Sequence, residues 1–420
     1  MKWVPEFPDS LTGLSGGNTR VKDLSITAAA ALTAQALNVG YGPVSSPGVP
    51  TLERRRIGHV GRTYLRAANY TAANPDLIAA QAGIGYAQAL GGGQVAAIDG
   101  MRFVVPVPSL MAKPNRKFFG PGRGMTWLNE INDQAFGIGY KTVAGTDRDC
   151  LHAIDLFFNT GAGPAHLPGV LVTDTGSYSD LVFGISALPG VNYRPELADL
   201  PDQKGWRINP VADYGPLNTF ARGKLDLGKV RRHWQEILRL IATVYTSKVS
   251  ASDVVRALHR GGNPTAPGEA IATLGRICKT LHLLQFIDSE AYRRGIKGMR
   301  NLQEGRHALA EKIFHGRRRE LFQRYREGME DQLGALGIVL NCVVLWNTVY
   351  IDAALNRLRA QGYPVRDEDV TRLSPFIRKH VNVHGKYSFT AVEPAGPGKG
   401  ATATRQLRDP DAGDDEDDSW

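Results

Sequence analysis

Two stretches of the chain, one alternating and one apolar, predict strands that each carry a carboxylate. The alternating stretch Gln94–Ile98 runs through Asp99 into Met101–Val107, which is the pattern of a central strand. The apolar run Gly169–Thr173 ends at Asp174. A strand that ends in Asp-Thr-Gly projects its carboxylate at a sheet edge, where a cleft can form. The pattern therefore predicts two acidic side chains in largely apolar surroundings.

A third acid lies in a segment with helical periodicity. Apolar residues recur at helical spacing from Leu302 to Ile313, and Glu304 stands one turn from His307 and Ala308. Taken alone, a glutamate on a helix is most often an exposed surface charge. Two strand acids and one helix acid are nevertheless the components of a two-metal phosphoryl-transfer site, so the three together are the first candidate for chemistry.

Breakers and periodicity divide the chain into five parts. Helical runs separated by Gly and Pro fill residues from about 20 to 90, and Gly91–Gly93 precedes the Asp99 strand. Amphipathic helix dominates from Lys229 to about Lys297, and Leu333–Val349 is typical of a buried core helix. The expected divisions are a helical lead-in (1–90), a first core part with the two strand acids (91–190), a mainly helical insertion (191–295), a second core part with the Glu304 helix (296–390) and an acidic disordered tail (391–420).

Charge narrows the class of partner. The chain has 50 Lys and Arg against 41 Asp and Glu, a net charge of +9. Seven of the acids lie in Asp409–Trp420, which has no Lys or Arg, so without this stretch the net charge rises by seven to +16. Such a positive field attracts polyanions, and nucleic acid is the leading partner class. A surface charged only for solubility is the alternative.

Cysteine usage and apolar runs favour a cytoplasmic protein. Cys150, Cys278 and Cys342 are far apart and fit a reducing compartment better than a disulfide framework. The chain has no run of about eighteen uninterrupted apolar residues and no signal-peptide pattern at Met1–Pro8, so we expect no membrane association.

Several residues outside the acids are weaker candidates. The Gly-rich stretch Phe119–Gly124 contains Arg123 and is either a contact to a phosphate backbone or a plain hairpin turn. Arg317, Arg318 and Arg319 line a DNA channel or form a solvated helical face. Trp346 has apolar neighbours at helical spacing and is expected to be a core anchor rather than a base-stacking platform. Asp180 is expected to start a helix.

The segments around the acids resemble the successive motifs of the Tn3-family transposase catalytic region, in the family's order. Supporting stretches extend the resemblance over about residues 20 to 390. The motifs are Ile98–Phe103, Thr173–Asp180, Glu304–Leu309 and Val344–Tyr350, and the supporting stretches are Tyr214–Asn218, Gly275–Thr280, Leu373–Pro375 and Gly385–Phe389.

The resemblance implies an α/β fold with an RNase H-like (DDE) catalytic core, a mainly helical insertion and helical flanking segments. It places the acidic triad, as catalytic and metal-binding residues, on Asp99, Asp174 and Glu304. Hard carboxylate oxygens suit two Mg²⁺ ions, for which Mn²⁺ can substitute. The activity implied is that of a DNA transposase: cleavage at transposon ends by water, then attack of the freed 3′-hydroxyl on target DNA in replicative transposition.

The resemblance also suggests roles and partners that the residues leave open. Arg306 and His307 flank Glu304 and either contact DNA at the scissile phosphate or hold the acid in place, with a surface ion pair as the alternative. The partners implied are transposon ends, target DNA and a second copy in a homodimer, within the bacterial cytoplasm and at the nucleoid when DNA is bound. Family members are usually longer, so end recognition is expected to need a half supplied by another chain.

Two other functions compete with transposition. One is a truncated product that binds DNA or full-length transposase without catalysis, as a regulator or a decayed remnant. The other is a stand-alone nuclease, which the motifs outside the triad disfavour. Metal-dependent cleavage that is abolished by Asp99→Ala separates an enzyme from a binder, because a binder keeps its DNA affinity and does not cut.

Overall fold

A computed structural model describes residues 3–14, 16, 21–145, 149–158, 167–176, 178–260, 263–389 and 407. The predicted tail from 391 onward lies outside the described residues except for Leu407. Within the described part, helices and a mixed sheet confirm the expected α/β class.

The central sheet has six strands, with three antiparallel members on one side and two parallel neighbours on the other. Along the sheet the order is β2-β3-β1-β5-β6, and β4 also pairs with β3. β1 is antiparallel to β3 and parallel to β5, which is parallel to β6. The strands are β1 (Val95–Val104), β2 (Lys113–Pro114), β3 (Arg123–Asn132), β4 (Gly137–Ala144), β5 (Val170–Thr173) and β6 (Asn192–Pro195).

Helices cover both faces of this sheet because β1 alternates its side chains between two hydrophobic clusters. Ala96 and Ile98 pack in a cluster with α6 (Asp149–Phe158) and α7 (Asp180–Ala187). Ala97 packs on the opposite face, in a cluster supplied by α11 (Ala266–Asp288) and α12 (Glu290–Ile313). The period-two alternation of a strand is the cause.

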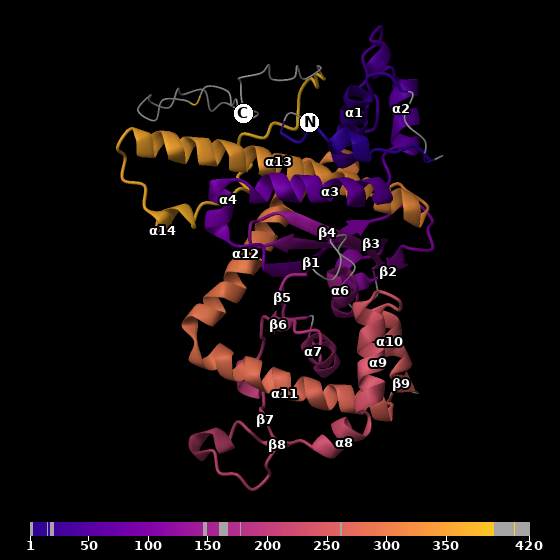
Figure 1. The fold of residues 1–420 in the computed structure, drawn as a ribbon. Coiled ribbons are helices and arrows are strands. Elements are labelled where there is room, and N and C mark those ends of the chain that lie inside the picture. The colour runs from indigo at the N-terminus through magenta and orange to yellow at the C-terminus, as the bar shows by residue number, and fades with distance from the viewer. Residues whose placement is uncertain are drawn as a thin grey trace.

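The amino-terminal helices and the long helix α13 (Arg326–Ala360) form a further layer on the sheet (Figure 1). α3 (Ala67–Ala82) runs alongside α13, and both helices contact β4. By length and composition α13 is long and apolar enough to cross a membrane, the only such helix among the described residues, but 61% of its most apolar window is buried inside the protein. The other helices here are α1 (Leu24–Ala36), α2 (Arg54–Thr63), α3 (Ala67–Ala82) and α4 (Gly85–Leu90).

The region between β6 and α12 is mainly helical, and α11 crosses it beside α7 (Figure 1). Glycine allows this approach: a Cβ on Gly275 would lie 1.7 Å from the backbone oxygen of Asp180. Remaining elements are α5 (Arg116–Phe119), β7 (Trp206–Arg207), β8 (Gly223–Lys224), α8 (Leu227–Arg232), α9 (Trp234–Tyr245), α10 (Ala251–Ala257), β9 (His259–Arg260), β10 (Asn263–Pro264), α14 (Asp367–Val370) and short 3-10 turns at Phe7–Ser10, Pro50–Leu52, Leu200–Asp202, Gly215–Asn218 and Gly316–Arg319.

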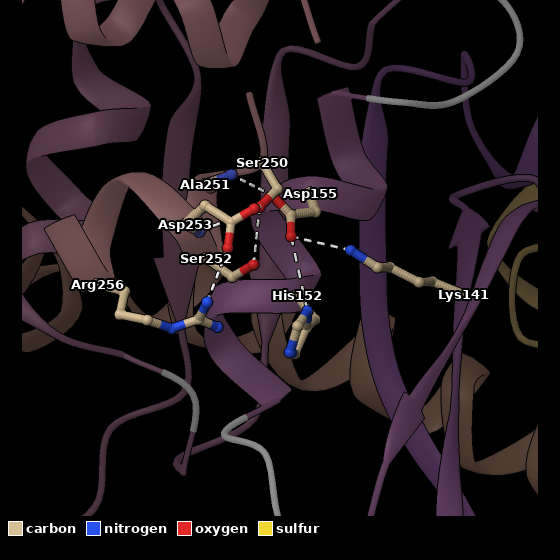
Figure 2. Close-up of polar contacts among 8 residues, drawn as sticks. All are labelled: Lys141, His152, Asp155, Ser250, Ala251, Ser252, Asp253 and Arg256. Atoms are coloured by element: carbon tan, nitrogen blue, oxygen red, sulfur yellow. Dashed lines mark hydrogen bonds and ion pairs between the residues drawn. The ribbon is translucent and has the colours of Figure 1, made fainter. Parts of the chain in front are cut away.

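A buried carboxylate joins this helical region to the sheet. Figure 2 shows Asp155 of α6 between Lys141 of β4 and Ala251 at the start of α10. The Lys141 Nζ lies 2.9 Å from Asp155 Oδ2, the His152 Nδ1 lies 3.6 Å from the same oxygen, and the Ala251 backbone N–H donates to Oδ1. Burial opposes ionisation of Asp155, but hydrogen bonds from His152 and Lys141 hold its pKa below the usual value. The charged carboxylate of α6 therefore links β4 to the start of α10.

Three local expectations can now be compared with the structure. Asp180 lies in the first turn of α7 behind the Ser179 cap, as predicted. The Gly-rich stretch runs from the end of α5 into β3, which pairs antiparallel with β2, and Arg123 is the first residue of β3. The prediction for Trp346 was wrong: the residue lies on the outer face of α13 and is 37% exposed. Its ring stacks on His380, with centroids 5.2 Å apart.

Candidate active site

Asp99 and Asp174 lie on neighbouring parallel strands. The register pairs Ala97 with Val172 and Ile98 with Thr173, so the next residues along both strands are the two acids. Ala97 and Val172 are buried beneath α11 and α12, and a side chain two positions further along a strand points to the same face. Both carboxylates therefore face α12.

Asp99 also lies at a seam between two hydrophobic clusters. Ala97 belongs to the cluster beneath α12, while Phe103 belongs to the one beneath α13, with Met101 packed against it. Leu302 of α12 packs against both clusters. The helix is thus fixed across the seam, and Glu304 follows two residues later.

The charges of the three acids act on one another. Burial raises the pKa of Asp99 to about 6, and the charges of Asp174 and Glu304 raise it further. A hydrogen bond from the neighbouring Gly100 N–H, 2.7 Å from Oδ1, and the charge of Arg300 oppose this rise. Glu304 is the outermost of the three, with 62% of its side chain exposed, and its Oε1 lies 3.8 Å from Arg300 Nη2. Arg300 is shared, because it also pairs with Glu196.

A polar network lies behind Asp99. Asn129 is its direct partner across β1 and β3, and its Nδ2 lies 3.0 Å from His307 Nε2. His307 Nδ1 lies 3.9 Å from Asp99 Oδ2. The amide of Gln303 donates to the Asn129 side-chain oxygen at 2.8 Å. Burial, together with the charges of Arg306 and Arg102, lowers the pKa of His307 to about 4, so the ring is neutral at physiological pH.

The three acids fit divalent cations by their chemistry. Three carboxylates supply hard oxygen ligands. Burial, and to a smaller extent the repulsion between the acids, raises the pKa of Asp99, and a cation held by the three carboxylates would reduce that repulsion. In the part of the chain that the structure describes, however, no group of three His, Cys, Asp or Glu side chains is arranged to hold a metal ion. The three carboxylates are therefore not arranged around one common metal position.

Comparison with known proteins assigns the family. The family model described as the Tn3 transposase DDE domain matches residues 1–387. The chain is 55% identical to the transposase for transposon Tn4556 of Streptomyces fradiae, over 97% of this chain and 44% of that protein.

The chain belongs to the Tn3 transposase family. It is also 42% identical to the transposase for transposon gamma-delta of Escherichia coli (strain K12), over 92% of this chain and 38% of that protein. It is 30% identical to the transposase for transposon Tn501 of Pseudomonas aeruginosa, over 90% of this chain and 39% of that protein. The chain thus spans less than half the length of these relatives.

The residues beside Glu304 in this Tn3-family chain point inward. Arg306 is 2% exposed and donates to Asn341 Oδ1 at 3.0 Å, and burial lowers its pKa to about 9. A DNA contact does not fit this placement, because the guanidinium faces α13 rather than solvent. The side chain of His307 is only 13% exposed, so it faces Asp99 and is not a surface contact to DNA.

The arginines predicted to line a DNA channel are exposed. Arg317, Arg318 and Arg319 have φ values of 47°, 57° and 61°, a left-handed conformation that is costly for side chains other than glycine. Asn38 holds this turn, because its amide donates to the backbone oxygens of Gly316 and Glu320. Arg123 is exposed at the start of β3, away from this turn in sequence.

The structure adds residues that sequence reasoning did not single out for function. Arg54 and Arg62 of α2 are two of them, and they line a cavity of about 590 Å³ together with the predicted Arg317. Their contribution was not foreseen, since α2 and the left-handed turn are far apart in the sequence. Asn129 and Gln303 carried no signal at all, because an isolated amide in a strand or a helix has no characteristic spacing.

Proposed function

We propose that this chain is the catalytic region of a DDE transposase with an RNase H-like core, which performs Mg²⁺-dependent DNA cleavage and strand transfer in replicative transposition of a Tn3-like element. One observation carries the proposal. Asp99 and Asp174 occupy adjacent positions on parallel strands, and Glu304 lies on the helix that covers the same face. The strand order, with three antiparallel and two parallel members, supports the core assignment.

Each acid has a definable part in this chemistry. Asp99 and Asp174, on the rigid sheet, provide fixed oxygen ligands, while the exposed Glu304 completes the set from α12. These three carboxylates would hold two Mg²⁺ ions, or Mn²⁺ in their place, which would supply Lewis-acid activation of the attacking oxygen and charge stabilisation of the leaving oxygen.

The same site serves both steps because only the nucleophile changes. In cleavage, water attacks a phosphodiester at the transposon end, the P–O3′ bond breaks, and a 3′-hydroxyl leaves with a proton. In strand transfer, that hydroxyl attacks a phosphodiester of the target, forming one P–O bond as another breaks. No net change in the number of phosphodiester bonds accompanies the second step.

Basic residues outside the acids provide a surface for the DNA backbone. Arg54, Arg62 and Arg317 line one cavity, and these three side chains form no ion pair within the described residues. Such cations favour phosphate contacts, which contribute affinity and salt dependence without reading sequence. Arg123, Arg318 and Arg319 are exposed and belong to the same proposal, whereas the buried Arg306 does not.

The remaining partners follow from the reaction. Action on two transposon ends favours a homodimer on DNA, with end recognition supplied by another half of the protein or by another chain. The corresponding location is the bacterial cytoplasm, at the nucleoid when DNA is bound.

A second candidate function is binding of DNA or of full-length transposase without catalysis. It is favoured by the acids, which do not converge on one metal position within the described residues. In that case the arginines would still bind DNA, and the acids would not act.

The test is Mg²⁺- or Mn²⁺-dependent nicking of a supercoiled plasmid that carries the inverted repeats of a Tn3-like element, with Glu304→Gln as the matched variant. The proposal predicts nicking by the wild-type chain and none by the variant. Retained DNA binding without nicking by either would favour the non-catalytic binder. Equal nicking by both would exclude Glu304 from the reaction.

A further inference from the structure

Two backbone carbonyls set the direction of the hydrogen bonds behind Asp99. A carbonyl oxygen only accepts. Gln303 Nε2 lies 3.0 Å from the backbone oxygen of Asn129, so the nitrogen of the Gln303 amide must point there. Asn129 Nδ2 lies 3.3 Å from the backbone oxygen of Asp99, so the nitrogen of the Asn129 amide must point there. Both amide orientations are therefore fixed by groups that cannot reverse.

These orientations determine the tautomer of His307. The Asn129 Oδ1 accepts from Gln303 at 2.8 Å, and the Asn129 Nδ2 donates to His307 Nε2 at 3.0 Å. A ring nitrogen that receives an N–H must carry a lone pair. Nε2 is then unprotonated, and the proton of the neutral ring sits on Nδ1, the atom 3.9 Å from Asp99 Oδ2. A doubly protonated ring is excluded, since its Nε2–H would face the amide N–H.

We infer that His307 is a positioning residue for Asp99, held as the Nδ1–H tautomer by the Asn129–Gln303 pair so that its N–H is directed at the carboxylate. The inference rests on the proposed function of Asp99 as a catalytic acid. The other carboxylate oxygen already accepts from the Gly100 N–H at 2.7 Å. The Gly100 N–H is hydrogen-bonded to its oxygen, whereas the His307 N–H, at 3.9 Å, is beyond hydrogen-bonding distance and acts as a dipole that favours this orientation of the carboxylate while its charge remains available.

A neutral donor suits this task better than a cation. Lys141 neutralises Asp155, and a lysine at the position of His307 would in the same way compete with Mg²⁺ for Asp99. A neutral N–H orients the acid without supplying the charge that the metal must bring. Partners of this kind typically change metal affinity or activity by about 10- to 100-fold when they are removed.

The tautomer can be observed without catalysis, by ¹⁵N NMR of the whole metal-free chain labelled at its ten histidines. His307→Gln identifies the His307 resonances by their loss. We expect a protonated, pyrrole-type Nδ1 and an unprotonated, pyridine-type Nε2. Asn129→Asp, which is nearly isosteric but only accepts when ionised, should move the proton to Nε2. A wild-type Nε2–H tautomer, or a folded Asn129→Asp protein with an unchanged tautomer, would overturn the inference.

A pair of substitutions at His307 separates positioning from packing. His307→Asn keeps an N–H near the Nδ1 position, whereas His307→Leu keeps volume and removes every donor. We expect the Mg²⁺ concentration for half-maximal nicking to rise by about 10- to 100-fold in the leucine variant and clearly less in the asparagine variant, with unchanged DNA affinity in both. Equal effects of the two substitutions would overturn the positioning role. If Asp99→Asn nicks like the wild type, the proposed function fails whatever the tautomer is.

Discussion

Asp99 and Asp155 lie in opposite electrostatic surroundings, although burial opposes the ionisation of both carboxylates. The Asp155 carboxylate has a lysine at 2.9 Å, accepts a backbone N–H, and has a pKa below its usual value. The Asp99 carboxylate forms no ion pair with Lys or Arg within the described residues, lies among the charges of Asp174 and Glu304, and has a pKa of about 6. The fold supplies a paired cation for Asp155, whereas at Asp99 it supplies only the weaker, unpaired influence of the Arg300 charge.

This difference separates a carboxylate that stabilises the fold from one that is suited to catalysis. A paired carboxylate such as Asp155 holds elements together, here β4, α6 and α10 (Figure 2). Like charges held close together in the folded protein repel one another and oppose folding. A ligand of opposite charge reduces this repulsion when it binds and thereby stabilises the folded state. Perturbed pKa values of this kind collect at functional sites.

The largest effect is expected on catalysis at Asp99. Asp99→Asn keeps the shape of the side chain and removes a charged ligand, so nicking of the inverted-repeat plasmid should fall by at least about 10³-fold, on the scale of lost transition-state electrostatics. Asp155→Asn, compared at a temperature where it is folded, should retain most of its rate. A similar loss in both variants would break the comparison.

The next effect is on stability at Asp155. Asp155→Asn leaves Lys141 without its buried partner and weakens the hydrogen bond from Ala251, so the free energy of unfolding should fall by about 2–4 kcal/mol. Urea unfolding at pH 7 measures it. The matched control is Asp253→Asn, which breaks an exposed pair with Arg256 and should cost less than about 1 kcal/mol. An equal loss in the free energy of unfolding for both variants would mean that Asp155 does not stabilise the fold by linking β4, α6 and α10.

The pH dependence of these two aspartates should run in opposite directions. The folded pKa of Asp99 is raised, so the metal-free protein loses stability as the pH rises from about 3.8 to about 6, and Asp99→Asn should be more stable than wild type by about 2–3 kcal/mol above that window. The folded pKa of Asp155 is lowered, so its contribution is present above the unfolded pKa and disappears as the pH falls through the folded value. Unfolding measured from about pH 2 to pH 8 tests both signs, because the Asp155 window lies below the unfolded pKa and the Asp99 window lies above it.

The smallest effect is expected for the stability of Glu304→Gln. The side chain is 62% exposed and its nearest cation is 3.8 Å away, so the melting temperature of the metal-free protein should change little. Its nicking activity should nevertheless be lost. A large loss of stability would mean that Glu304 is structural and would remove the argument from its loss of activity.

Local patterns were enough to predict the elements that carry the acids, because alternation around Asp99 and periodicity around Glu304 are short-range signals. The helix itself is longer than the periodic stretch from Leu302 to Ile313, because α12 begins at Glu290, behind the Ser289 cap. The pairing of Asp155 with Lys141 and the network through Asn129 were not predictable. They depend on which polar side chains meet across the fold, and no spacing in the sequence records that.

The most direct test of the central claim is binding of Mn²⁺ to the metal-free chain, followed by the loss of the free-ion signal in electron paramagnetic resonance. The account predicts binding by the wild-type chain, loss of that binding in Asp99→Asn and Asp174→Asn, and its retention in Asp155→Asn. Binding that is equal in the wild type and in the Asp99 and Asp174 variants would contradict it.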